Sequence, residues 1–279
     1  MSAHALSVVV PTRDRPDALA RCLAALARQT APSLEVVVVD DASRDAAAVW
    51  AAVARACPRA RVIRATGRGP AAARNTGVAA ASGAIVCFTD DDCVPEPGWA
   101  ARLQAACADG GAAAGTTVAD PAAGRCAAAA QLLTHVLQVR SLGEDAALGF
   151  APTCNLACAA DLARALEFDE SFPLAAGEDR EWCDRLARAG ELLTYVPDAV
   201  VVHRPQLGLS GLLRQGQRYG QGAVRFRQGG GGLAGGDYYR RLARECARAG
   251  AGVSALVVLA ECAVAAGAAG ELVRRTLGR

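Results

Sequence analysis

The sequence predicts an α/β fold in which a mostly parallel central sheet is flanked by helices. Three observations support this prediction. Short apolar runs alternate with helical patterns through the first half of the chain, a spacing that is typical of βαβ units. The runs are apolar throughout, as in strands that are covered on both faces. Polar clusters follow three of these runs, at the strand ends where open α/β sheets bind their ligands.

The first half of the chain contains four expected strands and four expected helices. Residues 6–10 form the first apolar run, and we expect Asp14 to cap the next helix, with Pro16 in its first turn. Apolar residues between 19 and 26 then recur at the i, i+3, i+4, i+7 spacing of one helix face. Further strands are expected at residues 34–39, 61–64 and 84–89, and further helices at 44–57, 70–81 and 98–108.

The second half of the chain is patterned differently. Strands are expected at residues 112–118, 150–158 and 192–203, with a helix over 178–189. The Ala-rich stretch of about thirty residues after 118 shows no strong hydrophobic period, so no helix or strand is predicted there. Arg-rich amphipathic helices follow His203, and glycines at 229–232 and 235–236 predict a flexible hinge or loop between them.

The composition excludes several classes of protein. Of the 279 residues, 52% are hydrophobic and 21% are charged, and 30 basic side chains, all of them arginine, face 28 acidic ones. These values argue against disorder and against nucleic-acid binding. The 11 cysteines include no C-x-x-C pair, which favours buried thiols in a reducing cytoplasm over structural zinc. We expect no export signal, because residues 1–6 lack the basic and apolar regions of one.

One stretch near the C-terminus is long enough to span a bilayer. Residues 249–270 contain a single charge, Glu261. They are mostly Ala and Gly, and a central glutamate is costly in hydrocarbon, which favours a packed or membrane-surface helix over a span. Two interpretations remain for these C-terminal helices. One is an ordinary helical cap, and the other is peripheral contact with an anionic inner leaflet through the helices and the arginines at 214, 218, 225 and 227.

The most informative polar cluster is Asp90-Asp91-Asp92, directly after an apolar run. Three adjacent carboxylates repel one another, and a divalent cation such as Mg²⁺ or Mn²⁺ would offset that repulsion. The alternative is a solvated acidic turn. The pair Asp40-Asp41 either caps a helix or accepts hydrogen bonds from a ribose or a base.

The remaining clusters carry weaker signals. The G-x-G-x-x-A pattern that begins at Gly67 follows the third strand and contains Pro70, so we expect a helix start that faces an anion near Arg74 and Asn75. Glu178-Asp179 opens a helix, where acidic residues are favoured by the helix dipole whatever their function. His203 ends an apolar strand and is either a structural residue or a contact to a phosphate or metal.

Taken in order, these motifs resemble family 2 inverting glycosyltransferases, which have the nucleotide-binding GT-A fold. The resemblance runs from Val8 to about Arg204 and implies a GT-A domain over residues 1–205, with a nucleotide-binding half at 1–110 and an acceptor half at 111–205. A C-terminal helical extension at 206–279 would follow. The motifs that carry it are VVVPTRDRPDAL, VVVVDDAS, GPAAARNTG, FTDDDC, AGEDREWCDRLARAG and VVHRP.

The resemblance also implies a donor and a site for it. The donor would be a nucleotide-diphospho-sugar carrying UDP, GDP or dTDP, with Asp41 facing the base and Asp90 touching the ribose. Asp91 would contact the nucleotide or share the metal. The other residues near the nucleotide would be Pro11, Thr12, Arg13, Arg74 and Asn75.

Three further roles come from the same resemblance. Asp92 would hold Mn²⁺ or Mg²⁺, and His203 would be a further contact to the metal or diphosphate. Asp179 would be the general base, and we expect it to be ionised at neutral pH because of the helix dipole and Arg180. Glu178 would cap the helix or contact the acceptor, whose pocket would include residues 115–149 and the helices after Pro205.

Two other functions fit part of the pattern. A nucleotidyltransferase can have a similar fold, but it normally carries a glycine-rich basic loop after its first strand, and PTRDRP contains no glycine. A non-catalytic sugar-nucleotide-binding protein would not need the aspartates at 90–92 together with Asp179.

Overall fold

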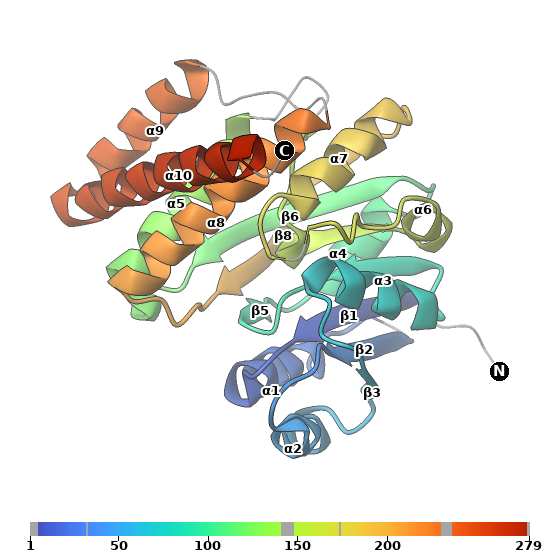
Figure 1. Ribbon diagram of the computed structural model, residues 1–279. Helices are drawn as coiled ribbons and strands as arrows, with labels where there is room; N and C mark the ends of the chain where they lie inside the picture. Colours follow the sequence, from blue (N-terminus) through green and yellow to red (C-terminus); the bar gives the residue numbers. More distant parts are fainter. Residues whose placement is uncertain (1–4, 32, 141–147, 173, 230–235, 278–279) are drawn as a thin grey trace.

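The computed structural model describes residues 5–31, 33–140, 148–172, 174–229 and 236–277. Within them, one sheet has the strand order β3-β2-β1-β4-β7-β6-β8-β5 (Figure 1). The first four strands in that order are parallel, β6 and β8 are parallel, and β7 and β5 run antiparallel to their neighbours, so the sheet is mixed. The strands are β1 (Leu6–Thr12), β2 (Leu34–Asp40), β3 (Arg61–Arg64), β4 (Ile85–Phe88), β5 (Cys93–Pro95), β6 (Ala112–Ala119), β7 (Leu156–Ala159) and β8 (Leu193–His203).

Each face of the sheet builds its own apolar core. Side chains alternate along a strand, so Val8 and Val10 enter one core while Val9 enters the other. The first core is covered by α1 (Pro16–Leu26), α2 (Ala46–Ala56) and α4 (Trp99–Ala106). The second is covered by α3 (Pro70–Ala80), α6 (Ala160–Ala165) and α7 (Glu178–Arg188).

The predicted elements of the first half are confirmed to within a few residues, but the helix cap expected at Asp14 is wrong, and one of the two interpretations of Asp40-Asp41 does not apply. Asp14 does not cap α1. Its φ is +56°, and its carboxylate accepts hydrogen bonds from the backbone N–H and Nε of Arg44, at 2.7 and 3.2 Å. The cap of α2 is Asp45, whose side chain accepts a hydrogen bond from the Ala48 N–H at 2.9 Å. Asp40-Asp41 therefore does not cap this helix.

The strand expected at residues 150–158 is shorter than predicted. Only β7, Leu156–Ala159, belongs to the sheet, and a 3₁₀ turn at Thr153–Asn155 precedes it. The Asn155 side-chain amide donates to the carbonyls of Thr116 and Ala199, at 2.9 Å each. These carbonyls flank the register shift between β6 and β8, so a side chain supplies the hydrogen bonds that strand pairing omits there.

The Ala-rich stretch, for which the sequence predicts no helix or strand, contains a long helix, α5 (Gly124–Arg140). This helix packs on β6 on one side and on the C-terminal helices on the other. A helix that is covered on several sides has no continuous polar face, and the sequence therefore shows no period. The following residues 141–147, part of the expected acceptor pocket, lie outside the described residues.

Three C-terminal helices complete the described structure: α8 (Leu209–Gln228), α9 (Gly236–Ala249) and α10 (Ala251–Leu277). Most of the expected glycine hinge, residues 230–235, lies outside the described part of the chain. α10 runs beside α8 (Figure 1), and the two touch through their backbones. A Cβ added at Gly220 would lie 2.0 Å from the Val264 carbonyl oxygen, and one at Gly267 would lie 2.0 Å from that of Gln217.

Candidate active site

The ends of β1, β2 and β4 bring three polar segments together, as the fold class predicts. The backbone N–H of Asp41, after β2, donates to the Thr12 carbonyl at the end of β1, at 2.9 Å. The Thr12 hydroxyl donates to Asp91, after β4, at 2.7 Å. Segments that are up to 79 residues apart in the chain therefore share one edge of the sheet.

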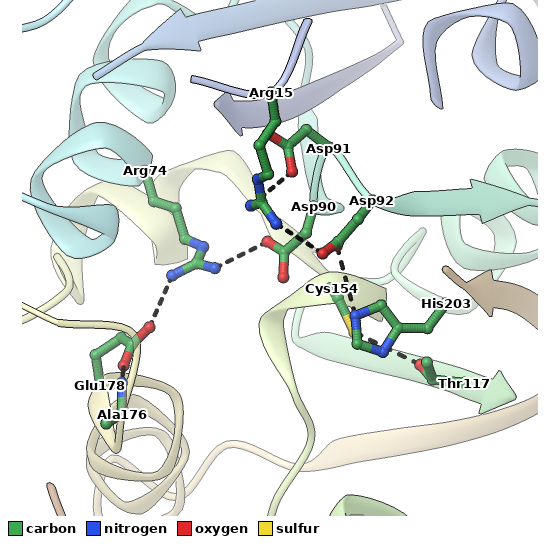
Figure 2. Close-up of polar contacts among 10 residues, drawn as sticks. All are labelled: Arg15, Arg74, Asp90, Asp91, Asp92, Thr117, Cys154, Ala176, Glu178 and His203. Carbon is green, nitrogen blue, oxygen red and sulfur yellow. Dashed lines mark hydrogen bonds and ion pairs between the residues drawn. The ribbon is translucent and has the colours of Figure 1, made fainter. Parts of the chain in front are cut away.

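Arg15 pairs with two of the three consecutive aspartates. Its guanidinium lies 2.6 Å from an oxygen of Asp91 and 2.7 Å from an oxygen of Asp92 (Figure 2). Asp91 is fully buried, and burial raises the pKa of its carboxyl to about 7 against the opposing charge of Arg15. A guanidinium thus offsets part of the repulsion for which the sequence suggested a divalent cation.

Asp92 faces His203, the last residue of β8. Their nearest oxygen and Nε2 atoms are 3.5 Å apart, and Nδ1 of the imidazole lies 3.0 Å from Oε1 of Gln131. Burial opposes both charges, but the mutual attraction lowers the pKa of Asp92 to about 2 and raises that of His203 to about 9. Asp92, Cys93 and His203 offer ligand atoms that all lie within 4.8 Å of one another. Among the described residues, this cluster could hold a metal ion.

Asp41 presents an unused hydrogen-bond acceptor at the same edge of the sheet. One carboxylate oxygen accepts from the Gly69 N–H at 3.0 Å. The other is buried and has no hydrogen-bond partner in the described structure, although buried polar atoms are nearly always paired. Arg13 lies 3.8 Å from the carboxylate, with a half-exposed side chain, and Pro11 is partly buried at the end of β1.

Arg74 is buried and forms ion pairs with two carboxylates that are far apart in the sequence. Its guanidinium lies 3.0 Å from Asp90 and 3.0 Å from Glu178 (Figure 2). The other Glu178 oxygen accepts from the Ala176 N–H at 2.8 Å, so both oxygens of this predicted cap or acceptor contact are occupied within the protein.

Asn75 uses both ends of its side-chain amide to hold one loop residue. It donates to the Phe168 carbonyl at 2.9 Å and accepts from the Phe168 N–H at 2.8 Å. Its contact with a nucleotide remains a prediction, and the observed function of the side chain is to attach α3 to the segment that leads to α7.

Asp179 lies in the first turn of α7, which begins after Gly177 at φ +96°. The buried side chains of Trp182 and Leu186 anchor this helix. Burial, with the adjacent Glu178 carboxylate, raises the pKa of Asp179 to about 7. Burial thus works against the ionised form that we expected at neutral pH, and its effect on the pKa exceeds that of Arg180.

α8 approaches the start of α7 from the C-terminal part of the chain. A Cβ added at Gly222 would lie 2.1 Å from the Ala176 carbonyl oxygen. One turn earlier on α8, Tyr219 accepts a hydrogen bond from Gln215 at 3.0 Å. Burial raises the pKa of Tyr219, and the nearby Asp179 charge adds to the rise. α8 therefore closes one side of the site.

Sequence reasoning missed Arg15, Gln131 and Tyr219. Arg15 lies within the quoted motif PTRDRP, three residues after Thr12, so its place in that motif was the available signal. Gln131 and Tyr219 lie on helices whose placement depends on tertiary packing, and no local pattern indicates them.

A family model described as Glycosyl transferase family 2 matches residues 7–133. Glycosyltransferase AglE of Haloferax volcanii is 30% identical over 231 residues, covering 78% of this chain and 73% of AglE. This chain belongs to glycosyltransferase family 2. The pre-mycofactocin glycosyltransferase of Mycobacterium tuberculosis is 30% identical over 233 residues, but the chain spans only 47% of that protein.

Solved glycosyltransferases have the same fold. The mannosyltransferase PcManGT from Pyrobaculum calidifontis, solved in complex with GDP-Man and Mn²⁺, matches with a TM-score of 0.62 and 25% identity, covering 96% of this chain and 76% of that one. TarS of S. aureus matches with a TM-score of 0.54 over 79% of this family 2 chain. The predicted GT-A fold is confirmed, including the helices that follow β8.

Proposed function

We propose that this family 2 glycosyltransferase is metal-dependent and inverting, and that it moves a sugar from a nucleotide-diphospho-sugar to an acceptor hydroxyl. The observation that carries the proposal is the Arg74 bridge, with 3.0 Å contacts to Asp90 and to Glu178. The bridge brings the aspartates that would serve the donor next to the helix start that carries Asp179. The GDP-Man and Mn²⁺ bound to the mannosyltransferase support the donor class and the cation.

The donor would lie along the edge formed by β1, β2 and β4. The unpartnered oxygen of Asp41 suits an N–H of the base, because a buried acceptor without a partner costs free energy until a ligand supplies one. Asp90 would bind the ribose, and Arg74 would hold the Asp90 carboxylate in place. Pro11 and Arg13 would line the nucleoside, and Thr12 would act through its hydrogen bond to Asp91.

A divalent cation fits the donor set of Asp92 and His203, since carboxylate oxygen and imidazole nitrogen both suit Mn²⁺, with Asp91 adjacent. When bound, the cation would neutralise charge that develops on the departing diphosphate. Arg15, which contacts both aspartates, adds a second positive group on the leaving-group side.

Asp179 would take the proton of the acceptor hydroxyl as its oxygen attacks the anomeric carbon. The new C–O bond would form on the face opposite the bond to the diphosphate, which breaks, so the configuration inverts. A carboxyl whose pKa is raised to about 7 is a stronger base than an ordinary aspartate, and the deprotonated form is still available near neutral pH.

The proposal is tested with a donor screen on the purified chain. UDP, GDP and dTDP sugars are titrated calorimetrically with and without Mn²⁺, and turnover is followed as release of the nucleoside diphosphate when acceptors are added. The expected results are cation-enhanced binding of one donor and a product with inverted configuration, read by NMR. Donor binding without turnover under all acceptors would favour the sugar-nucleotide-binding alternative, and pyrophosphate release from a nucleoside triphosphate would favour a nucleotidyltransferase.

A further inference from the structure

The solvent side of α10 carries no charge over most of its length. Val258 and Leu259 are 61% and 45% exposed, and Leu272 and Val273 are 51% and 55% exposed. From Ala251 to Val273, each exposed residue of this described helix is Ala, Gly, Val, Leu or Cys. At 1.5 Å per residue, this uncharged face is roughly 33 Å long. Contiguous apolar surfaces of this extent usually contact a partner or a membrane.

The two glutamates of α10 up to that point are turned inward. Glu261 accepts a hydrogen bond from the Tyr238 hydroxyl at 2.7 Å. Glu271 is 4% exposed and faces Arg225, Arg274 and Arg275 at 3.7, 2.8 and 2.8 Å. The uncharged face therefore results from the orientation of the helix as well as from its composition.

Charge is segregated along the chain in a way that indicates what covers this face. Residues 206–279 contain 11 arginines and 4 acidic residues, while residues 1–205 contain 19 arginines and 24 acidic residues. On α9, which packs beside α10 (Figure 1), Arg241 and Arg244 are exposed and have no acidic partner among the described residues. Positive charge next to an apolar helix face is the pattern that binds anionic lipid.

We propose that α9 and α10 dock this protein flat on the surface of an anionic lipid bilayer, with the uncharged face of α10 at the boundary between headgroups and acyl chains. The inference is independent of the donor and of the reaction. A second copy of the chain is a poorer occupant, because a symmetric contact through α10 would bring two positively charged C-terminal segments together.

The packing of α10 favours the surface over a span. The helix has the length and the mean hydropathy, 1.9, of a membrane-spanning helix. Its inner face, however, touches α8 through backbone at Gly220 and Gly267 and forms the contacts of Glu261 and Glu271. A span would break these contacts and would place both glutamates in or near hydrocarbon, which is costly.

The test is co-sedimentation of the whole protein with vesicles of phosphatidylcholine alone and of phosphatidylcholine mixed with phosphatidylglycerol. We expect binding to the mixed vesicles that weakens with salt. Val258→Glu with Leu259→Glu should reduce the partition coefficient at least about tenfold, because charge enters the contact face. Arg241→Gln with Arg244→Gln should reduce it about 25-fold on anionic vesicles only, since each arginine near such a surface contributes about fivefold.

Matched controls separate the proposed face from general surface effects. Leu192→Glu changes a residue that is 66% exposed in the other part of the chain, and Arg28→Gln with Arg55→Gln removes two exposed charges there. Neither should change vesicle binding, and the thermal midpoints of all variants should match that of the wild type.

Four results would overturn the proposal. The first two are the absence of vesicle binding at low salt and an equal loss of vesicle binding in the Leu192→Glu control. The third is resistance of the bound protein to alkaline extraction from vesicles, which indicates a span. The fourth is a stable dimer in sedimentation that dissociates in the variant Val258→Glu with Leu259→Glu.

Discussion

The Arg74 guanidinium lies 3.0 Å from the Glu178 carboxylate, across 104 residues of sequence. Both side chains are buried, so water does not solvate either charge and each depends on the other for stabilisation. Because Arg74 also contacts Asp90, the pair attaches the first helix turn that carries Asp179 to the carboxyl end of β4. The position of the proposed base therefore depends on a residue of α3, within the expected nucleotide-binding half of the chain.

Removing this guanidinium should destabilise the protein. Arg74→Met leaves the buried Glu178 carboxylate without its counter-charge, and breaking a buried pair typically costs about 3–5 kcal/mol. Urea unfolding at pH 8 measures the loss. The double variant Arg74→Met with Glu178→Gln should recover part of it, and a double variant that is no more stable than Arg74→Met would contradict the pairing.

Asp179→Asn should separate chemistry from binding. Loss of a general base typically lowers kcat about 10²–10⁴-fold, while donor and cation binding, measured by calorimetry, should remain close to wild type. Glu178→Gln should reduce kcat less. If Glu178→Gln is the more damaging change, or if Asp179→Asn retains near-normal turnover, the base is misassigned.

The same Asp179→Asn variant should be more stable than the wild type, and more so at pH 8 than at pH 5. The folded-state pKa of Asp179 is raised from 3.8 to about 7, so the folded protein loses stability as pH rises through this interval and the aspartate ionises. The neutral asparagine avoids that loss. Chemical unfolding at the two pH values measures the difference, and an equal gain at both would contradict the raised pKa.

Activity should rise with pH and level off above about 7, because only deprotonated Asp179 accepts a proton. Glu178→Gln removes the adjacent negative charge that contributes to this pKa, so the acid limb of kcat/KM should move to lower pH. An acid limb that stays in place in Glu178→Gln would show that the limb reports another group.

Cation dependence should rest on Asp92. We expect donor affinity to rise with Mn²⁺ or Mg²⁺ in the wild type and to become independent of the cation in Asp92→Ala. Asp161→Ala is the matched control, since its side chain is fully exposed on α6, and it should behave as wild type. Cation-enhanced binding that persists in Asp92→Ala would place the cation elsewhere.

The sequence indicates those parts of the site that are local. Asp41 and the aspartates at 90–92 directly follow apolar strands, so their shared edge follows from the parallel arrangement of the strands. The pairing of Arg15 with Asp92 and of Arg74 with Glu178 depends on which segments the fold brings together, and no local pattern encodes that. The raised pKa of Asp179 was missed for the same reason, because burial is a tertiary property.

The elements that the sequence missed or misplaced have a common cause. α5 is packed on several sides, and its periodicity disappears with its polar face. Asn155 takes over hydrogen bonds that a strand would make, so an apolar run is interrupted where strand propensity alone predicts continuation. Asp14 belongs to a loop-to-loop contact with Arg44, which only the folded chain reveals.

The glycines of α8 make the C-terminal helices and the start of α7 one cooperative unit. Gly220 touches α10 and Gly222 touches the Ala176 carbonyl, both without an intervening side chain. Contacts between backbones cannot adjust by changing rotamers, so α10, α8 and the loop before Asp179 open together or not at all. Their slowest amide hydrogens should therefore exchange at a common rate, and damage to α10 should reach the proposed base, Asp179, through α8.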